Sequence, residues 1–512
     1  MKDSRTKKVA LNAMSSVIQQ VIVVLVGFVN RKIFLFTIGV AYLGVNGLFS
    51  NILSLLAMSE LGVGTAIIYN LYKPLSEGKE DEVCKLMNFY KQAYRVIAAV
   101  VILIGVVICL CLEVFININD SGFTLKELQI IFLLYLLQTA STYLFSYKRS
   151  LFFADQKAYI TSYIDTGFKI FTSIATAVIM VLTKDFYLYL ILTIILNLIN
   201  NASISFYADR KYPYIKRKQK LEIEKVKMIF ANIKNIFIHK IASTAITSTD
   251  NILISKFVGI AVVGLYSNYQ LVIDSVANIM RRILQSIQAS VGNLLATENT
   301  DRAEEILYQA TLVAHLIASF SSVALSCLIQ DFIVLVFGQE YTLEFSIVFI
   351  SIFSFLLVLM KEPLYQFVSV SGLFKEDRTN AIIGMTLNLG ISLILVMRIG
   401  LSGVFWGTVI SSIVTFGMKI NFFYSKFLKK SSLKYHSMII SCLLITVIEI
   451  VFTKLACNML MIENVYINFV CKMVICVLIP NSINIGLFWN QKDFQRLVQR
   501  GKELVKKEKG DV

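Results

Sequence analysis

The heptapeptide GVAYLGV at residues 39–45 returns, slightly changed, as GIAVVGL at residues 259–265. The alignment continues at the same offset, without a gap, through the next span. It ends by pairing the acidic loop EGKEDE at 77–82 with TENTDR at 297–302. Similarity at a fixed distance along a chain is the signature of an internal repeat. The chain is therefore expected to contain two copies of one structural unit.

The repeat extends beyond these segments. LFFADQKAY at 151–159 matches GLFKEDRTN at 372–380 at nearly the same offset, so the similarity covers six predicted membrane spans. Because an even number of spans separates the copies, both copies have the same orientation in the membrane. The repeat is then parallel, related by an axis along the membrane normal.

The composition indicates what surrounds the chain. Of 512 residues, 56% are hydrophobic and 16% are charged, and the mean hydropathy is +0.70. This leaves too little polar surface to cover a water-soluble globule. Apolar runs of roughly 20 residues, enough to cross a hydrocarbon core about 30 Å thick, recur along the whole sequence. Backbone groups in such a core must be satisfied internally, so an all-α integral membrane protein is expected.

About fourteen segments are long and apolar enough to be transmembrane helices. They are approximately 9–37, 42–70, 91–115, 126–147, 158–182, 186–207, 229–257, 262–290, 306–328, 344–370, 380–397, 402–425, 436–456 and 465–489.

These spans predict two six-helix lobes with an added helix pair. The expected order is an N-terminal lobe (1–208), a basic cytoplasmic linker (209–227), a C-terminal lobe (228–428), the helix pair (429–489) and a basic cytoplasmic tail (490–512). Two lobes related by a parallel repeat are typical of transporters that rock about a central path.

The basic residues predict the topology. Lysine and arginine are concentrated in the tails and the even-numbered connections, and the linker, the 426–434 loop and the tail after Gln491 hold most of the net charge of +16. The positive-inside rule therefore places both termini in the cytoplasm of a bacterial-type cell (inner) membrane. Contact with anionic membrane lipid explains this basic surface, so nucleic-acid binding is not expected.

The cysteines give no sign of a metal centre. The eight cysteines lie mostly inside spans and show no paired metal-ligand spacing. They are interpreted as small apolar residues, and neither a metal nor another cofactor is expected.

Several spans carry a polar face that lipid would not accept. In the span 262–290 such residues recur at spacings of three and four: Ser267, Gln270, Asp274, Asn278, Arg281, Gln285 and Gln288. The spans 9–37, 42–70 and 229–257 carry similar groups, among them Asn46, Ser50, Ser54, Ser243 and Thr247. These four spans are expected to form the walls of a shared polar cavity.

Ionisable residues inside spans are costly and by default mark a pathway. Arg31 and Lys32, and likewise Arg281 and Arg282, fit either a pathway or snorkelling to the interface from near the ends of their spans. Asp274 lies nearer the middle of its span. The candidates for cavity charge or ion coupling are Glu60, Asp250, Asp274, Lys361 and Glu362, of which the last two also fit a neutralised pair at the kink made by Pro363. Lys169, His315, Lys419 and Lys472 are isolated and are interpreted as structural.

The chemistry of the cavity predicts its cargo. Amides and hydroxyls suit sugar hydroxyl groups, for which Asn278 and Gln285 are candidates, whereas arginines suit phosphate through paired hydrogen bonds. An anionic glycolipid has both kinds of group.

The segments 42–87 (YLGVNGLFSNILSLLAMSELGVGTAIIYNLYKPLSEGKEDEVCKLM) and 281–296 (RRILQSIQASVGNLLA), together with the basic linker, resemble the bacterial polysaccharide flippases. This family belongs to the multidrug, oligosaccharidyl-lipid and polysaccharide exporter superfamily. The resemblance covers essentially the whole chain, although its motifs are diffuse. It implies two six-helix lobes and translocation of undecaprenyl-diphosphate-linked oligosaccharide for O-antigen, capsule or exopolysaccharide synthesis.

The resemblance also implies residue roles. Cationic residues of the central cavity hold the sugar or diphosphate in this family, and the positions that match here are Arg31, Lys32, Arg281 and Arg282. The diphosphate would enter near Arg281 and Arg282 and leave toward Arg31 and Lys32. A polysaccharide polymerase and glycosyltransferases are the partners implied. The acidic candidates could balance this charge or bind a coupling proton or sodium ion.

Three alternative functions fit the sequence less well. A multidrug antiporter of the same superfamily would suit a more acidic and aromatic cavity than this one. An embedded polymerase or glycosyltransferase would normally need catalytic residues in a large loop, whereas the external loops near 116–125 and 329–343 are short and lack Lys, Arg and His. A scaffold protein stays open, because diffuse polarity can also bind other helices. The chain is therefore expected to be a transporter and not an enzyme.

Overall fold

The computed structural model describes residues 22–57, 63–118, 121–227, 229, 244, 248–285, 300–371, 373–460, 462–491, 494–496 and 499. Of residues 63, 65, 66 and 374–376 it describes the backbone alone. The chain forms two compact units, Met1–Ser267 and Asn268–Val512. The boundaries predicted for the two lobes, the linker, the helix pair and the tail stay predictions.

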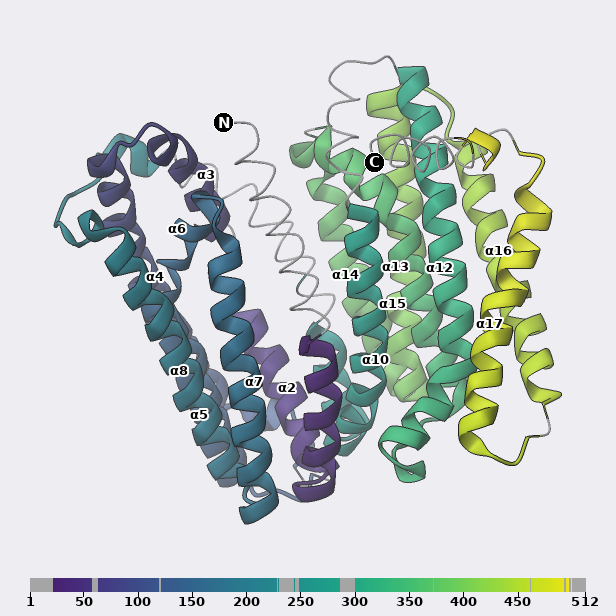
Figure 1. Ribbon diagram of the computed structural model, residues 1–512, viewed down its shortest axis with the longest axis horizontal. Helices are drawn as coiled ribbons and strands as arrows, with labels where there is room; N and C mark the ends of the chain where they lie inside the picture. Colours follow the sequence, from purple (N-terminus) through teal and green to yellow (C-terminus); the bar gives the residue numbers. More distant parts are fainter. Residues whose placement is uncertain are drawn as a thin grey trace, which may run out of the picture. The chain divides into compact units, whose positions relative to one another are not determined.

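The described residues of unit 1 form helices joined by turns and loops (Figure 1). Residues 22–37 and 248–257 are helical at its two ends. Between them lie α2 (Val40–Leu56), α3 (Val63–Ser76), α4 (Glu80–Leu110), η2 (Leu112–Val114), α5 (Leu125–Ser146), α6 (Arg149–Ala154), α7 (Ala158–Thr183), α8 (Phe186–Lys211) and η3 (Pro213–Lys216).

Unit 2 begins inside α10 (Ile260–Gln285), whose first turns belong to unit 1. The elements that follow are α12 (Thr300–Val336), η4 (Gln339–Tyr341), α13 (Phe345–Val370), α14 (Phe374–Ile399), α15 (Leu401–Phe423), the π-helical turn η5 (Tyr424–Leu428), α16 (Leu433–Asn458) and α17 (Val465–Phe488).

The structure confirms the all-α membrane fold class. Among the described residues, 11 helices are long and apolar enough to cross a membrane, and α2 is a shorter apolar helix. Their outward faces carry large apolar side chains such as Leu103 on α4 and Leu478 on α17, which are 69% and 60% exposed. Such faces are stable against lipid and not against water.

Helix starts are fixed by local side-chain caps. Thr124 and Glu127 form a reciprocal capping box at the start of α5, and Asp185 accepts hydrogen bonds from two backbone N–H groups at the start of α8. Asn464 caps α17 in the same way. These residues satisfy backbone donors that a helix start leaves without partners.

The structure confirms the register of the internal repeat. The helices α2 and α5 begin at Val40 and Leu125, and their counterparts α10 and α13 begin at Ile260 and Phe345, at the same offset in both cases. The glycines that precede α2 and α10 are equivalent too. Gly39 and Gly259 have φ angles of 103° and 135°, which side chains rarely tolerate.

The first turns of α2 and α10 touch each other within unit 1. A Cβ atom on Gly44 would overlap the carbonyl oxygen of Ile260, and a Cβ atom on Gly264 would overlap the carbonyl oxygen of Val40. These two clashes are equivalent under the offset of the repeat. The second glycine of each heptapeptide, Gly44 and Gly264, is therefore required for close approach of the two backbones.

Two span starts differ from the prediction. Of the predicted span 42–70, α2 covers the residues up to Leu56 and α3 those from Val63 onward, and residues 58–62 lie outside the described residues. Both α4 and α12 begin earlier than predicted, with charged first turns that hydrophobicity alone does not register as helix. The short α6, which follows α5 closely, was also missed.

Candidate functional site

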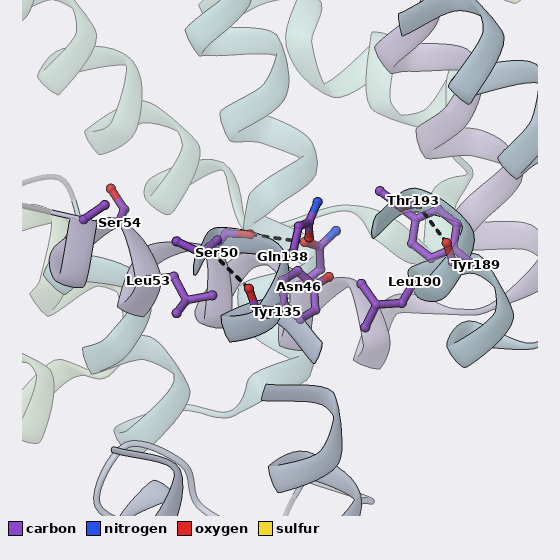
Figure 2. A pocket seen from close by; sticks show the side chains of 11 residues that line it. Asn46, Ser50, Leu53, Ser54, Tyr135, Gln138, Tyr189, Leu190 and Thr193 are labelled. Atoms are coloured by element: carbon purple, nitrogen blue, oxygen red, sulfur yellow. Dashed lines mark hydrogen bonds between the residues drawn. The ribbon is translucent and has the colours of Figure 1, made fainter. Parts of the chain in front are cut away.

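A polar pocket of about 390 Å³ lies inside unit 1, between α2, α5 and α8 (Figure 2). Its lining comes from three stretches of chain: Asn46, Ser50, Leu53, Ser54 and Ala57; Tyr135, Gln138 and Thr139; Tyr189, Leu190 and Thr193. No lining residue is charged. Asn46, Ser50 and Ser54 are polar residues that the sequence assigned to a cavity shared with the spans 9–37, 229–257 and 262–290. They line a pocket, but its other walls come from α5 and α8, so the predicted shared cavity stays a prediction.

Several hydroxyl groups of the pocket donate to their own helix. Thr139 donates to the backbone oxygen of Tyr135 at 3.0 Å, and Thr193 to that of Tyr189 at 2.8 Å. Ser50 donates to the Asn46 side-chain oxygen at 3.3 Å. With their protons placed on the helix, these hydroxyl oxygens keep lone pairs that can accept hydrogen bonds. The pocket can therefore bind a neutral ligand rich in hydroxyl groups.

Arg31 lies next to this pocket. Its guanidinium group donates to the Ser267 hydroxyl at 2.8 Å, and it lies within electrostatic range of Tyr189, which lines the pocket. Arg31 is half-buried, whereas Lys32, the next residue, is exposed. Of the two predicted cations in this helix, Arg31 is the one associated with the pocket.

Unit 2 contains buried charge. Lys419 on α15 and Asp377 on α14 form an ion pair of 2.6 Å with side chains only 14% and 5% exposed. Asn380 donates to the same carboxylate at 3.1 Å. The Lys419 ammonium also lies 4.1 Å from the centroid of the Tyr365 ring, so it makes a cation–π contact. Lys419 is therefore not isolated, and the structure corrects that prediction.

A second cation lies beside this pair. Lys361 on α13 is 7% exposed and within electrostatic range of both Lys419 and Arg281. It forms no ion pair in the described part of the chain. Its neighbour Glu362 instead accepts hydrogen bonds from Gln285 at 3.0 Å and from Gln366. Lys361 and Glu362 are thus not a mutually neutralised pair.

Lys361 is the buried cation of this arrangement that has no ion pair among the described residues. Lys419 is paired with Asp377, and Asp274 lies within electrostatic range of Arg281. Glu362 accepts hydrogen bonds from amides and makes no ion pair with Lys361. Burying a cation is costly unless an anion is close. The Nε atom of Arg281 also has no hydrogen-bond partner among the described residues. The cluster can therefore receive an anionic group.

The other candidates are more scattered. Asp274, Asn278 and Arg282 are exposed on α10, and Asp274 lies within electrostatic range of Arg281. Asp250 is half-buried in the helical segment 248–257. Glu60 lies outside the described residues. Whether these side chains share one cavity stays a prediction.

Three cysteines that sequence spacing did not connect come together in unit 2. The sulfur atoms of Cys327, Cys457 and Cys476, on α12, α16 and α17, lie within 4.8 Å of one another. Three thiolates at this separation could hold a soft metal ion. Their positions in the sequence hid the group, because each cysteine comes from a different helix.

Comparison with known proteins shows the fold. No family model matches the sequence, and no curated protein sequence does. The structure of lipid II flippase MurJ in an inward closed conformation matches 94% of this chain and 99% of its own, with a TM-score of 0.69 and 14% identity. The chain has the fold of MurJ.

Transporters of the MATE family share this MurJ-like fold. An inward-facing multidrug resistance MATE transporter of the MOP superfamily covers 80% of this chain and 96% of its own, with a TM-score of 0.63 and 13% identity. A Vibrio cholerae MATE transporter covers 83% and 99%, with a TM-score of 0.55 and 14% identity. At these identities the comparison establishes the MurJ-like fold but not the transported substrate, which has to be inferred from the site residues.

Proposed function

We propose that the chain is a flippase that moves undecaprenyl-diphosphate-linked oligosaccharide repeat units from the cytoplasmic to the outer leaflet of the inner membrane by alternating access. Both termini would lie in the cytoplasm. The cargo would serve the synthesis of an O-antigen, capsule or exopolysaccharide, next to a polymerase and glycosyltransferases.

The observation that carries this proposal is the division of polarity between the two units. Unit 1 offers an uncharged pocket of hydroxyls and amides, with Arg31 beside it. Unit 2 offers the cation-rich cluster of Arg281, Lys361 and Lys419. An oligosaccharide needs the first kind of surface and a diphosphate needs the second. The similarity to a lipid II flippase supports the same substrate class.

The residues have distinct proposed roles. Arg31 and the pocket would hold sugar hydroxyls, with Lys32 at the exit, while Arg281, Arg282 and Lys361 would hold the diphosphate. Asn278 and Gln285 would extend the hydrogen bonding along α10. Asp250, Asp274, Glu60 and Glu362 would balance charge as the lobes move.

The test is flipping of a fluorescent undecaprenyl-diphosphate oligosaccharide in proteoliposomes. The purified protein should accelerate flipping over empty vesicles, and the double variant Arg281→Ala and Arg282→Ala should lose that acceleration. Lys218→Gln, which removes an exposed cation outside the cluster, is the matched control and should keep it. Flipping at the empty-vesicle rate by oriented, folded wild-type protein with a cognate sugar would refute the proposal.

One observation favours a second function, a multidrug antiporter. Tyr135 and Tyr189 both line the pocket, and aromatic rings suit flat organic cations. An antiporter would expel such a cation under an imposed proton or sodium gradient without needing a lipid-linked sugar. Efflux from the same vesicles, unaffected by the loss of Arg281 and Arg282, would support this function over flipping.

A further inference from the structure

The helix α12 packs against α16 and α17 (Figure 1). A file of buried polar side chains runs along α12 at this contact. On α12 the residues recur at spacings of three and four and are at most 4% exposed: Thr311, His315, Ser319, Ser322 and Ser326. Facing helices contribute Tyr435, Thr446, Glu449, Thr453 and Asn484, each at most 2% exposed. Nothing in the proposed substrate sites uses these groups.

Hydrogen bonds connect the centre of this file. The Asn484 side-chain nitrogen donates to the Ser319 hydroxyl at 3.0 Å, so its oxygen faces His315, whose Nε2 lies 3.1 Å away. That oxygen can only accept, so Nε2 of His315 carries the proton and donates. Toward one end of the file, Thr311 and Tyr435 share a hydrogen bond of 2.8 Å.

Glu449 is a residue of this file whose carboxyl oxygens lack hydrogen-bond partners among the described residues. Its side chain is 0% exposed and lies beside the Ser319 hydroxyl, yet neither carboxyl oxygen has a well-directed hydrogen bond in the described part of the chain. It has no salt bridge there either. An ionised carboxylate in such surroundings costs several kcal/mol, which binding a proton removes.

Within the described part of the chain, no charged group acts on Glu449, and Cys442 is a thiol within electrostatic range of it. Other titratable groups on the three helices include His315 and Cys327 on α12, Cys476 and Lys472 on α17, and Tyr435, Lys454 and Cys457 on α16. Of the two lysines, Lys472 forms an ion pair with Asp331 at 2.6 Å. The sequence-based prediction that Lys472 is isolated is therefore wrong. Lys454 lies over the Phe345 ring, 2.7 Å from its centroid.

We infer that Glu449 is a proton-binding site and that the proton it carries is the coupling ion of transport. Coupling rests on the proposed function, whereas proton binding stands on the buried file alone. One proton adds to one carboxylate oxygen to form the carboxylic acid, and no other bond breaks. Ser319, Asn484 and His315 are positioning residues, which hold a hydroxyl group against the carboxyl group.

The first measurement is pH-difference infrared spectroscopy of the full-length protein in lipid. Wild-type protein should show a protonated-carboxyl band that disappears when the pH is raised, and Glu449→Gln should lack that band. Glu463→Gln, at an exposed position in the loop before α17, is the matched control and should retain it. Asn484→Leu should shift the pH at which the band disappears, because the hydrogen-bonded chain to Ser319 is cut.

The second measurement is cargo flipping in proteoliposomes with and without a proton gradient. The gradient should accelerate flipping by wild-type protein and by Glu463→Gln, and should have no effect on Glu449→Gln. A wild-type protein without the titrating band, or a band that follows sodium concentration instead of pH, would overturn the proton assignment.

The two proposals fail in different ways. If flipping occurs but ignores the gradient, coupling by Glu449 is wrong and the flippase function stands. If no flipping occurs while the Glu449 band titrates, proton binding stands and the flippase function is wrong.

Discussion

Equivalent helices of the repeat contribute to an uncharged pocket in unit 1 and to a charged cluster in unit 2. The pocket lies between α2, α5 and α8, whereas the cluster draws on α10 and α13, the counterparts of α2 and α5, and on α14 and α15. At the offset of the repeat, Ser50 and Ser54 of the pocket correspond to Gln270 and Asp274. The duplicated scaffold therefore keeps its backbone plan while its polar chemistry diverges, as an asymmetric cargo with a sugar end and a phosphate end would require.

The largest expected effect breaks the backbone contact that the two copies share. Gly44→Ala places a methyl group against the carbonyl oxygen of Ile260, which cannot move as a side chain can, so we expect a loss of about 1–3 kcal/mol of stability. Thermal unfolding in detergent measures it. Gly167→Ala in α7 is the matched control, because nothing lies within 4 Å of its added carbon. Equal stability of the two variants would contradict the close approach.

The next effect removes charge from the cluster in unit 2 and makes it resemble the pocket in unit 1. Lys361→Met should slow flipping of the diphosphate lipid by about tenfold or more, since a charge-assisted hydrogen bond contributes about 1.5–3 kcal/mol. Its thermal stability should stay equal or rise, because a buried cation without an ion pair is removed. A variant that loses stability and keeps its flipping rate would assign Lys361 a purely structural role.

A smaller effect tests the pocket in unit 1. Asn46→Leu removes an amide from the lining at constant size, so flipping of a sugar-bearing lipid should fall by about threefold to tenfold, the value of one neutral hydrogen bond. Flipping of undecaprenyl diphosphate without sugar should not change. A decrease for both lipids would show that the pocket does not distinguish the sugar.

Sequence reasoning found the features that follow from periodicity. The offset between GVAYLGV and GIAVVGL predicted the helix register, and Asn46, Ser50 and Ser54, which the sequence assigned to a shared cavity, line a pocket within unit 1. It missed the pairing of Lys419 with Asp377, which come from different helices. A single residue in an apolar run looks isolated until packing supplies its partner.

The same limit explains the polar file of the C-terminal helices. Glu449 interrupts an apolar segment only once, and its neighbours His315 and Asn484 lie on other helices, far before it and well after it in the sequence. No local spacing connects them. The packing of α12 against α16 and α17 brings them together. Hydrophobic periodicity predicts that these three helices exist, but it does not predict how they pack.

The smallest expected effect compares two surface contacts whose carboxylates, Asp81 and Asp301, occupy equivalent positions of the repeat. Lys430 pairs with Asp301 and Glu304 at the start of α12, at 2.5 and 2.6 Å, whereas Arg217 pairs with Asp81 at the start of α4 at 3.4 Å and is more exposed. Lys430→Gln should therefore cost about 0.5–1 kcal/mol and Arg217→Gln less. Thermal unfolding of both variants beside the wild type measures the two costs.

The pH dependence of the Lys430 contact sharpens this comparison. The two carboxylates raise the pKa of Lys430 above its ordinary value of 10.5. The folded state then holds this proton more tightly than the unfolded state, so the contribution is complete below pH 10.5 and is lost as the pH rises through the raised pKa. The difference in stability between wild type and Lys430→Gln should shrink from neutral to strongly alkaline pH. A difference that stays constant would mean that packing of the lysine stem, and not its charge, joins the segment after η5 to α12.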